Sequence, residues 1–166
     1  MQVFDVERIK SRKGLNCPLW TENKALLIQL YIKLFTLVTK HGAYIDGFAA
    51  PQYRKHKINC SAKLVLENKP QWIRDFWLCD IDLNGIALLE EMKAQHYAKG
   101  RRIRVVAGDF NITVQKILDT GRIKERTATF ALLDQRTLEC EWATVQKLAA
   151  HKKATKIELF YFFPSG

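Results

Sequence analysis

The stretch of sequence that decides the fold is Ala43-Tyr44-Ile45-Asp46-Gly47-Phe48-Ala49-Ala50-Pro51. Its apolar start predicts a buried β-strand over residues 43–49, and its small residues let the backbone turn sharply. Asp46 stands at the exit of the strand, and Gly47 carries no side chain that would block a ligand. In an open α/β sheet, ligands bind beyond the carboxyl ends of the strands, where the strand order reverses. A buried strand with a plain tight turn is the alternative, and the order of the later segments favours a binding crevice.

Downstream of this stretch, apolar strands alternate with amphipathic helices. Further strands are expected over residues 75–81, 102–107, 128–133 and 156–163, and helices over residues 20–40, 62–68, 83–99, 112–120 and 138–151. Continuous apolar strands are typical of a parallel sheet that is covered on both faces. Right-handed crossovers then favour the strand order 3-2-1-4-5. The sequence therefore predicts an α/β fold, a Rossmann-like three-layer α/β/α domain with a mostly parallel sheet.

One domain over residues 20–166 is expected, after a polar and basic lead-in over residues 1–19. The spacing of apolar residues in the first helix sets its expected inward face. These residues are Leu26, Leu27, Leu30, Ile32, Leu34, Phe35 and Val38. Two later helices are expected to turn Tyr97 and Trp142 inward.

Acidic side chains follow four of the expected strands. They are Asp46, Asp80 with Asp82, Asp109 and Asp134. Because the carboxyl ends of parallel strands meet at one edge of a sheet, we expect these carboxylates to gather round one crevice. Asp80 can accept hydrogen bonds from both hydroxyls of a ribose, while Asp82 and Ser61 are expected to cap the helices that follow them. Helix capping is the alternative role for some of these acids, and Asn111 is expected either at the crevice or as a cap.

The charge balance favours a polyanionic partner. The chain carries 27 Lys and Arg against 17 Asp and Glu, a formal net charge of +10. Nucleic acid is the first candidate, although basic proteins without such a partner exist. The loop over residues 51–60 holds Arg54, Lys55 and Lys57, which are candidates for phosphate contacts, with a solvated surface loop as the alternative. Trp20, Tyr31 and Phe35 are expected to pack on the sheet, with base stacking as the alternative.

The cysteines give no indication of a metal site. Cys17, Cys60, Cys79 and Cys140 form no C-x-x-C pair and have no histidine at ligand spacing, so no metal is expected. Scattered free thiols are typical of a reducing cytoplasm. The sequence contains neither a secretory signal core nor an apolar run of membrane-spanning length. A cytoplasmic protein without a membrane partner is therefore expected.

This layout resembles the core of class I S-adenosylmethionine-dependent methyltransferases up to their fifth strand. It resembles more closely the three-Cys-motif partner protein (TcmP) family of bacteria and their phages. The matching pieces, between residues 20 and 164, are Thr21-Glu22-Asn23-Lys24, Tyr44-Ile45-Asp46-Gly47-Phe48-Ala49-Ala50-Pro51, Cys60-Ser61, Asp80-Ile81-Asp82, Gly108-Asp109-Phe110-Asn111, and Phe130-Ala131-Leu132-Leu133-Asp134 followed by Trp142. The resemblance implies a three-cysteine-motif protein as a partner. It also implies that the closing strands of the sheet are missing and that the chain is truncated at its C-terminus.

The resemblance further implies that S-adenosylmethionine binds at the crevice. The residues that would line the methionine end of the cofactor are Asp46, Gly47, Phe48 and Ala49. Asp80 would hold the ribose, and Asp109 would meet the adenine amine with Phe110 against the ring. Asp134 would face the methyl acceptor, so the implied activity is methyl transfer on or with nucleic acid.

The sequence departs from the family pattern at two positions. Gln52 follows Pro51 where the family often has glycine, and Gln135 follows Asp134 where it often has proline. Gln52 in place of glycine leaves less space for a cofactor. With Gln135 after Asp134, the chain also lacks the Asp-Pro-Pro-Tyr motif that is used at this strand end to methylate amino groups of bases. The alternative function is therefore a non-catalytic basic module on the same fold that binds nucleic acid or docks a partner. No glycine-rich dinucleotide motif or P-loop occurs in the sequence, and the oligomeric state stays open.

Overall fold

The computed structural model describes residues 19–51, 60–98, 100–135 and 137–163, with residues 19–23 described by their backbone alone. Its elements in chain order are α1 (Leu19–Thr39), β1 (Gly42–Asp46), α2 (Ser61–Glu67), β2 (Ile73–Asp80), α3 (Leu83–Gln95), β3 (Arg102–Ala107), α4 (Phe110–Leu118), β4 (Thr129–Leu133), α5 (Trp142–Ala150) and β5 (Glu158–Tyr161). Each expected strand and helix is present, with its bounds shifted by a few residues at most. The alternation of apolar strands with amphipathic helices was therefore sufficient to locate the elements.

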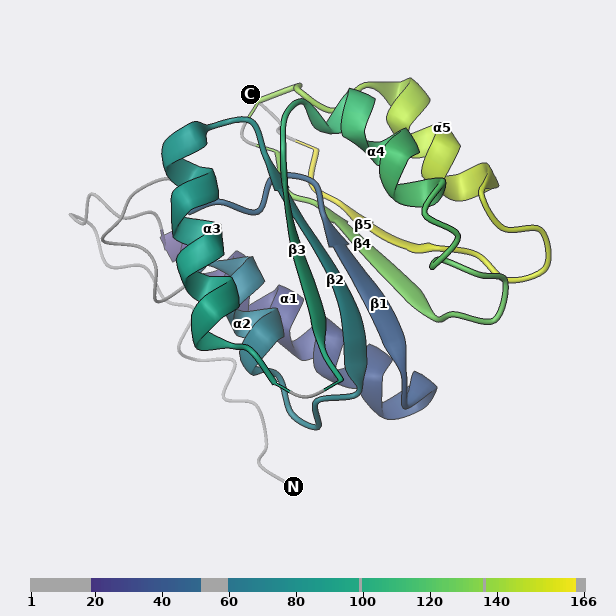
Figure 1. The fold of residues 1–166 in the computed structure, drawn as a ribbon, viewed down its shortest axis with the longest axis horizontal. Coiled ribbons are helices and arrows are strands. Elements are labelled where there is room, and N and C mark those ends of the chain that lie inside the picture. The colour runs from purple at the N-terminus through teal and green to yellow at the C-terminus, as the bar shows by residue number, and fades with distance from the viewer. Residues whose placement is uncertain (1–18, 52–59, 99, 136, 164–166) are drawn as a thin grey trace.

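The five strands form one parallel sheet with the order β3-β2-β1-β4-β5, as the sequence predicts (Figure 1). β1 is the central strand, and all five of its residues are buried. The chain moves outward to one side from β1 through β2 to β3, and then returns to the other side of β1 to form β4. The strand order consequently reverses between β1 and β4, which is the place where α/β sheets open a crevice for a ligand.

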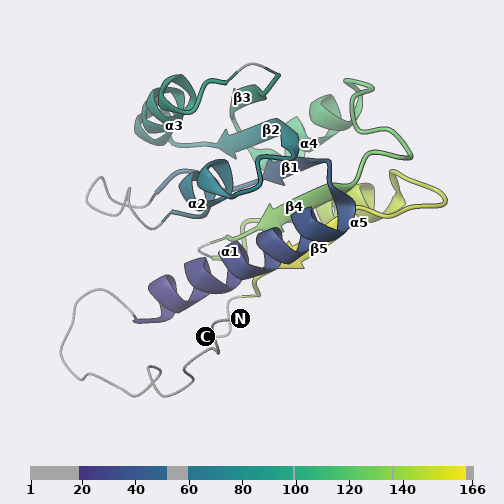
Figure 2. The same cartoon turned by 90° about the horizontal axis from the view of Figure 1, so that it is seen from below.

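Two layers of helices cover the sheet (Figures 1 and 2). α1, α2 and α3 pack on the face to which Tyr44, Phe76 and Phe130 point, and α4 and α5 pack on the face to which Ile45 and Trp77 point. Successive side chains of a strand point to opposite faces. Because both faces are covered, most positions along the central strands are apolar, which is why most of each central strand appears in the sequence as an apolar run.

Fewer apolar residues of α1 are buried than its sequence pattern predicts. Ile28 and Ile32 are fully buried, but Leu27, Leu34 and Val38 are 50%, 54% and 82% exposed, and Leu26 is also exposed. The helix contacts the sheet with one side and α2 with the next, so its remaining apolar side chains face solvent.

Two aromatic predictions were also wrong. Trp142 is 67% exposed because it is the first residue of α5, and Tyr97 is 80% exposed because it follows the end of α3. Neither residue lies on the buried side of a helix. The inward positions of α5 are instead held by Val145 and Leu148, as expected.

Candidate functional site

The acids that follow β1, β2, β3 and β4 lie at the carboxyl edge of the sheet. β1 pairs with both β2 and β4, which brings the ends of these three strands next to one another. The backbone N–H of Ala50, just after β1, donates to Oδ2 of Asp80 at 2.9 Å. The N–H of Gly108, just after β3, donates to the carbonyl of Asp80 at 2.9 Å. The segments that leave β1 and β3 are thus both fixed to the end of β2.

Asp46 is a fully buried carboxylate at the end of β1. The hydroxyl of Tyr44 donates to its Oδ2 at 2.8 Å, the N–H of Phe48 to its Oδ1 at 3.2 Å, and the hydroxyl of Ser61 to its Oδ2 at 3.3 Å. Desolvation, together with the nearby charge of Asp134, raises the pKa of Asp46 to about 7, because it outweighs these hydrogen bonds, which lower the pKa. This carboxyl group therefore changes its charge close to neutral pH.

Asp80 organises the turn after β1. Its Oδ1 accepts the N–H of Asp82 at 2.9 Å while its Oδ2 holds Ala50. Asp82 caps α3 by accepting the N–H groups of Asn84 and Gly85, as predicted. A Cβ atom on Gly85 would lie 2.5 Å from the Cβ atom of Ala50, so glycine allows α3 to approach the turn this closely.

A phenylalanine ring fills the space beside Gly47. A Cβ atom on Gly47 would lie 2.7 Å from Cδ1 of Phe110, whose side chain is only 2% exposed. The Phe110 ring also packs edge-to-face on Phe48, with 6.0 Å between ring centroids. The glycine is thus needed for packing of α4 on β1, and Phe110 belongs to the core of the second face.

The helix after β3 is capped by Asp109, whose Oδ1 accepts the N–H of Asn111 at 2.8 Å. Asn111 itself joins α4 to α5. Its Nδ2 donates to the carbonyl of Glu139 at 2.9 Å, and its Oδ1 accepts the hydroxyl of Thr144 at 2.7 Å. The sequence predicted that Asn111 would either cap a helix or stand at the crevice. In the structure it does neither, because its side chain connects α4 to the segment around the start of α5.

Asp134, which follows β4, is paired with a lysine of α1. Nζ of Lys24 lies 2.5 Å from Oδ1 of Asp134, and the two side chains are 18% and 16% exposed. The same ammonium lies 5.0 Å from the centroid of the Phe162 ring. The next residue, Gln135, is buried and donates to the hydroxyl of Tyr161 at 2.8 Å. Gln135 therefore ties the end of β4 to β5.

Sequence reasoning missed three members of this edge: Lys24, Tyr44 and Ser61. Ser61 was expected to cap α2, but the N-cap is Cys60, and the Ser61 hydroxyl bonds Asp46 instead. Tyr44 was expected only as part of the buried strand over residues 43–49. Lys24 stands four residues before Ile28 and so shares the buried side of α1, which was the available signal.

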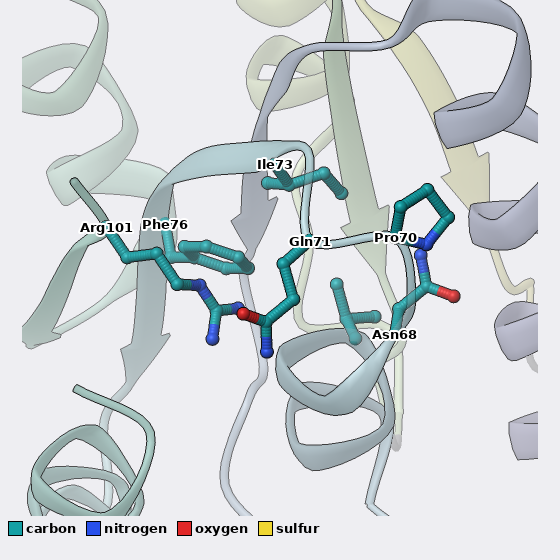
Figure 3. A pocket seen from close by; sticks show the side chains of 7 residues that line it. Asn68, Pro70, Gln71, Ile73, Phe76 and Arg101 are labelled. Atoms are coloured by element: carbon teal, nitrogen blue, oxygen red, sulfur yellow. The ribbon is translucent and has the colours of Figure 1, made fainter. Parts of the chain in front are cut away.

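A shallow depression lies at the opposite, amino-terminal end of the sheet (Figure 3). Its lining residues are Val65, Asn68, Pro70, Gln71, Ile73, Phe76 and Arg101. The Arg101 guanidinium lies 4.7 Å from the centroid of the Phe76 ring and donates to the carbonyl of Leu66 at 2.9 Å. It also donates to the carbonyl of His96, so this side chain joins the ends of α2 and α3. We assign the depression to packing.

Several predicted features have no structural description. Arg54, Lys55 and Lys57 lie outside the residues that the structure describes. Within the described ranges, no cluster of three or more His, Cys, Asp or Glu side chains is suited to hold a metal ion. Searched over the same residues, none of the helices combines the length and apolar character required to cross a bilayer.

The fold and the acids at its carboxyl edge define a Rossmann-like α/β domain. No protein-family model matches the chain, and neither the curated proteins nor the solved structures contain a match. The site is therefore interpreted from its own residues.

Proposed function

We propose that this chain binds S-adenosylmethionine at the carboxyl edge of its sheet and acts as a methyltransferase-like domain on or with nucleic acid. The observation that carries the proposal is the strand-order reversal between β1 and β4, with Asp46 on one side of it and Asp134 on the other. The basic net charge of +10 supports nucleic acid as the acceptor or partner. The resemblance to the three-Cys-motif partner family adds a protein partner to this proposal.

The chemistry of Asp80 suits the ribose of such a cofactor. A carboxylate accepts about four hydrogen bonds. Among the described residues, the backbone N–H groups of Ala50 and Asp82 use one position on each oxygen, and the second position on each would accept the two ribose hydroxyls. The Asp109 carboxylate caps α4 and could also accept a hydrogen bond from the adenine amine. Because Phe110 is buried on Gly47, its contribution would be to shape the floor of the site rather than to stack on the adenine.

The remaining residues would position the reactants. When bound, the cofactor supplies an electrophilic methyl group on a positively charged sulfur. Two carboxyl groups would lie near that charge: Asp134, which is paired with Lys24, and Asp46, which is negatively charged only in its ionised form. Lys24 holds Asp134 in one orientation, and Asp46 fixes the turn after β1 through Phe48 and the start of α2 through Ser61. Positioning of an acceptor in line with the methyl group supplies much of the reduction in barrier.

Isothermal titration calorimetry with S-adenosylmethionine and S-adenosylhomocysteine tests the proposal. Both ligands are expected to bind the folded wild type, and Asp80→Asn is expected to weaken binding by about tenfold or more, since it removes an acceptor at the ribose. Asp119→Asn, at the exposed end of α4, is the matched control and should bind like the wild type. Absence of binding by the folded wild type would refute the cofactor proposal.

A second candidate function is a non-catalytic basic module that binds nucleic acid or docks a partner. It is favoured by the Lys24–Asp134 ion pair, which engages the carboxylate proposed to face the acceptor. This candidate predicts salt-dependent binding of DNA or RNA that does not respond to cofactor. Neutralising Arg54, Lys55 and Lys57 together should weaken that binding, and an unchanged affinity would remove the basic loop from it.

A further inference from the structure

Helix α1 presents a row of apolar side chains to solvent. We call this row the α1 stripe; its members are Leu27, Leu30, Leu34, Leu37 and Val38. Leu27, Leu34 and Val38 are at least half exposed, and Leu37 is 45% exposed. Their spacing of three and four residues aligns them along one side of the helix. A contiguous exposed apolar row of this kind marks an interaction surface.

Leu27, Leu34 and Val38 of the α1 stripe lie on the side of α1 that is nearest to β5, while Leu30 and Leu37 lie on the side that faces away from the sheet. Tyr31 identifies the side nearest to β5, because its ring packs on Phe160 with 5.4 Å between centroids and its hydroxyl donates to Glu158. Leu27 and Leu34 stand four residues before and three residues after Tyr31, so they share its side of the helix. Helix α1, which carries the stripe, and β5 therefore lie side by side (Figure 2).

Lys24 is on the β5 side of α1 and is paired with Asp134, whereas Lys33 and Lys40 lie toward the other side of the helix. Thr36 marks that side, since its hydroxyl accepts a hydrogen bond from Asn68, just beyond α2. Lys33 and Lys40 stand three residues before and four residues after Thr36 and thus lie toward its side, although Lys33 also stands four residues before Leu37 and borders the stripe there. The surface formed by Leu27, Leu34, Val38 and β5 is consequently mostly apolar, with Lys33 and Lys40 directed away from β5.

β5 has an open edge in the part of the chain that the structure describes, because only β4 pairs with it there. The N–H of Phe162 donates to the carbonyl of Leu133. Backbone N–H groups alternate in direction along a strand, so those of Leu159 and Tyr161 point away from β4. An edge of this kind offers unpaired donors and acceptors to another strand.

The other edge of the sheet is protected. β3 carries Arg102 and Arg104, whose side chains bond the carboxylate of Asp75 on β2. Charged side chains on an edge strand discourage pairing with another chain. β5 has a single charged residue, Glu158, at its start, and Phe162 and Phe163 continue its apolar run. The two edges thus differ, and only β5 combines an open edge with an adjoining apolar helix face.

We infer that two copies of this chain associate through this surface, with their β5 strands antiparallel across a two-fold axis and their α1 stripes side by side. A strand edge is complementary to itself in the antiparallel direction. That direction places Glu158 of one copy opposite the aromatic end of β5 in the other, whereas a parallel arrangement would place two glutamates side by side. This inference does not depend on the proposed function.

The size of the surface is sufficient for such a dimer. A stable interface buries roughly 800 Å² on each partner. An apolar area of that order is supplied by the five side chains of the α1 stripe, of which three are at least half exposed, together with the edge of β5 and Phe163, which is 68% exposed. Lys33 and Lys40 face away from β5 and Lys24 is paired with Asp134, so neither exposed lysine of α1 lies between the stripe and β5.

Sedimentation equilibrium of the purified full chain, from about 1 µM to about 1 mM, measures the association. The wild type is expected to dimerise, and the dimer to tighten as salt is raised, because screening reduces repulsion between two chains of net charge +10. Leu34→Lys should raise the dissociation constant about tenfold or more, since it places a charge in the centre of the interface. Val38→Lys serves as a second variant, and Tyr97→Lys, which changes an equally exposed residue beyond α3, is the matched control.

Hydrogen exchange supplies an independent reading of the geometry. In the wild-type dimer the amides of Leu159 and Tyr161 should be protected, and in Leu34→Lys they should exchange freely. A wild type that remains monomeric up to the highest concentration would overturn the inference, as would a dimer that both lysine variants leave intact. Protection of the β5 amides in a monomer would show that another segment of the same chain covers the edge of β5, and this result would also overturn the inference.

Discussion

Lys24 and Asp134 are 110 residues apart in the chain, and the Nζ atom of one lies 2.5 Å from the Oδ1 atom of the other. The pair connects the first turns of α1 to the end of β4, across the point at which the strand order reverses. Both side chains are mostly buried. Because a mostly buried charge is costly without its partner, this pair fixes how α1 sits on the carboxyl edge of the sheet.

The first prediction concerns this pair. Lys24→Met should lower the free energy of unfolding by about 1–3 kcal/mol, because it leaves the Asp134 carboxylate without its partner. Urea denaturation measures the change. Lys93→Met is the control: the pair of Lys93 with Glu90 is exposed, so its loss should cost less than about 1 kcal/mol. Equal losses in the two variants would contradict the role given to Lys24.

The second prediction concerns the buried carboxyl of Asp46. Its pKa rises from an ordinary value of 3.8 to about 7 on folding, so the folded state prefers the protonated form. The stabilising contribution is complete below pH 4, declines as the pH rises toward 7, and changes little above that, with a total of up to roughly 4 kcal/mol. Asp46→Asn should remove this slope from a series of urea denaturations between pH 4 and 8. A variant that keeps the slope would assign it to another group.

The third prediction concerns the contact between Gly47 and Phe110. Gly47→Ala should destabilise the protein by about 1–3 kcal/mol, because the new methyl group would meet the Phe110 ring. Phe110→Leu should reduce that penalty when the two changes are combined, since a smaller side chain leaves room for the methyl. Thermal denaturation of the two single variants and the double variant gives the coupling. Additive effects would mean that the ring does not oppose the methyl group.

The fourth prediction concerns Asp75. Desolvation opposes ionisation of this carboxyl, but the hydrogen bonds from Arg102 and Arg104 prevail and lower its pKa. Asp75→Asn should therefore cost about 1–3 kcal/mol at neutral pH. Because the folded pKa is depressed, the wild type loses this stabilisation as the pH falls below the ordinary value of 3.8. The difference in the free energy of unfolding between variant and wild type should shrink in acid. A difference that does not depend on pH would contradict the ion pairs as its source.

The sequence was sufficient to predict the fold because its determinants are local. Each strand is mostly apolar, and each helix repeats apolar residues at helical spacing, so the order of elements and the strand order could be predicted. β1 ends at Asp46 rather than Ala49, because the Asp46 carboxylate accepts the N–H of Phe48 and turns the chain. An apolar run alone does not reveal where such a side-chain bond ends a strand.

The site was predicted in part. The acids at the strand ends were found because position in a strand fixes their edge of the sheet. The partners of these acids were not found, because Lys24 and Ser61 reach them only after the chain has folded. The exposed leucines of α1 were misplaced for a related reason: spacing shows that a helix has an apolar side, but not how much of that side its neighbours cover.

The arginines of β3 have a consequence for assembly. A sheet with two receptive margins can add molecules without end and grow into fibres. Here Arg102 and Arg104 disfavour pairing at the β3 edge, so a second chain that pairs with β5 occupies the one edge that favours pairing. Self-association that begins at β5 therefore terminates at a finite particle, and removing these arginines is the change that would turn it into polymerisation.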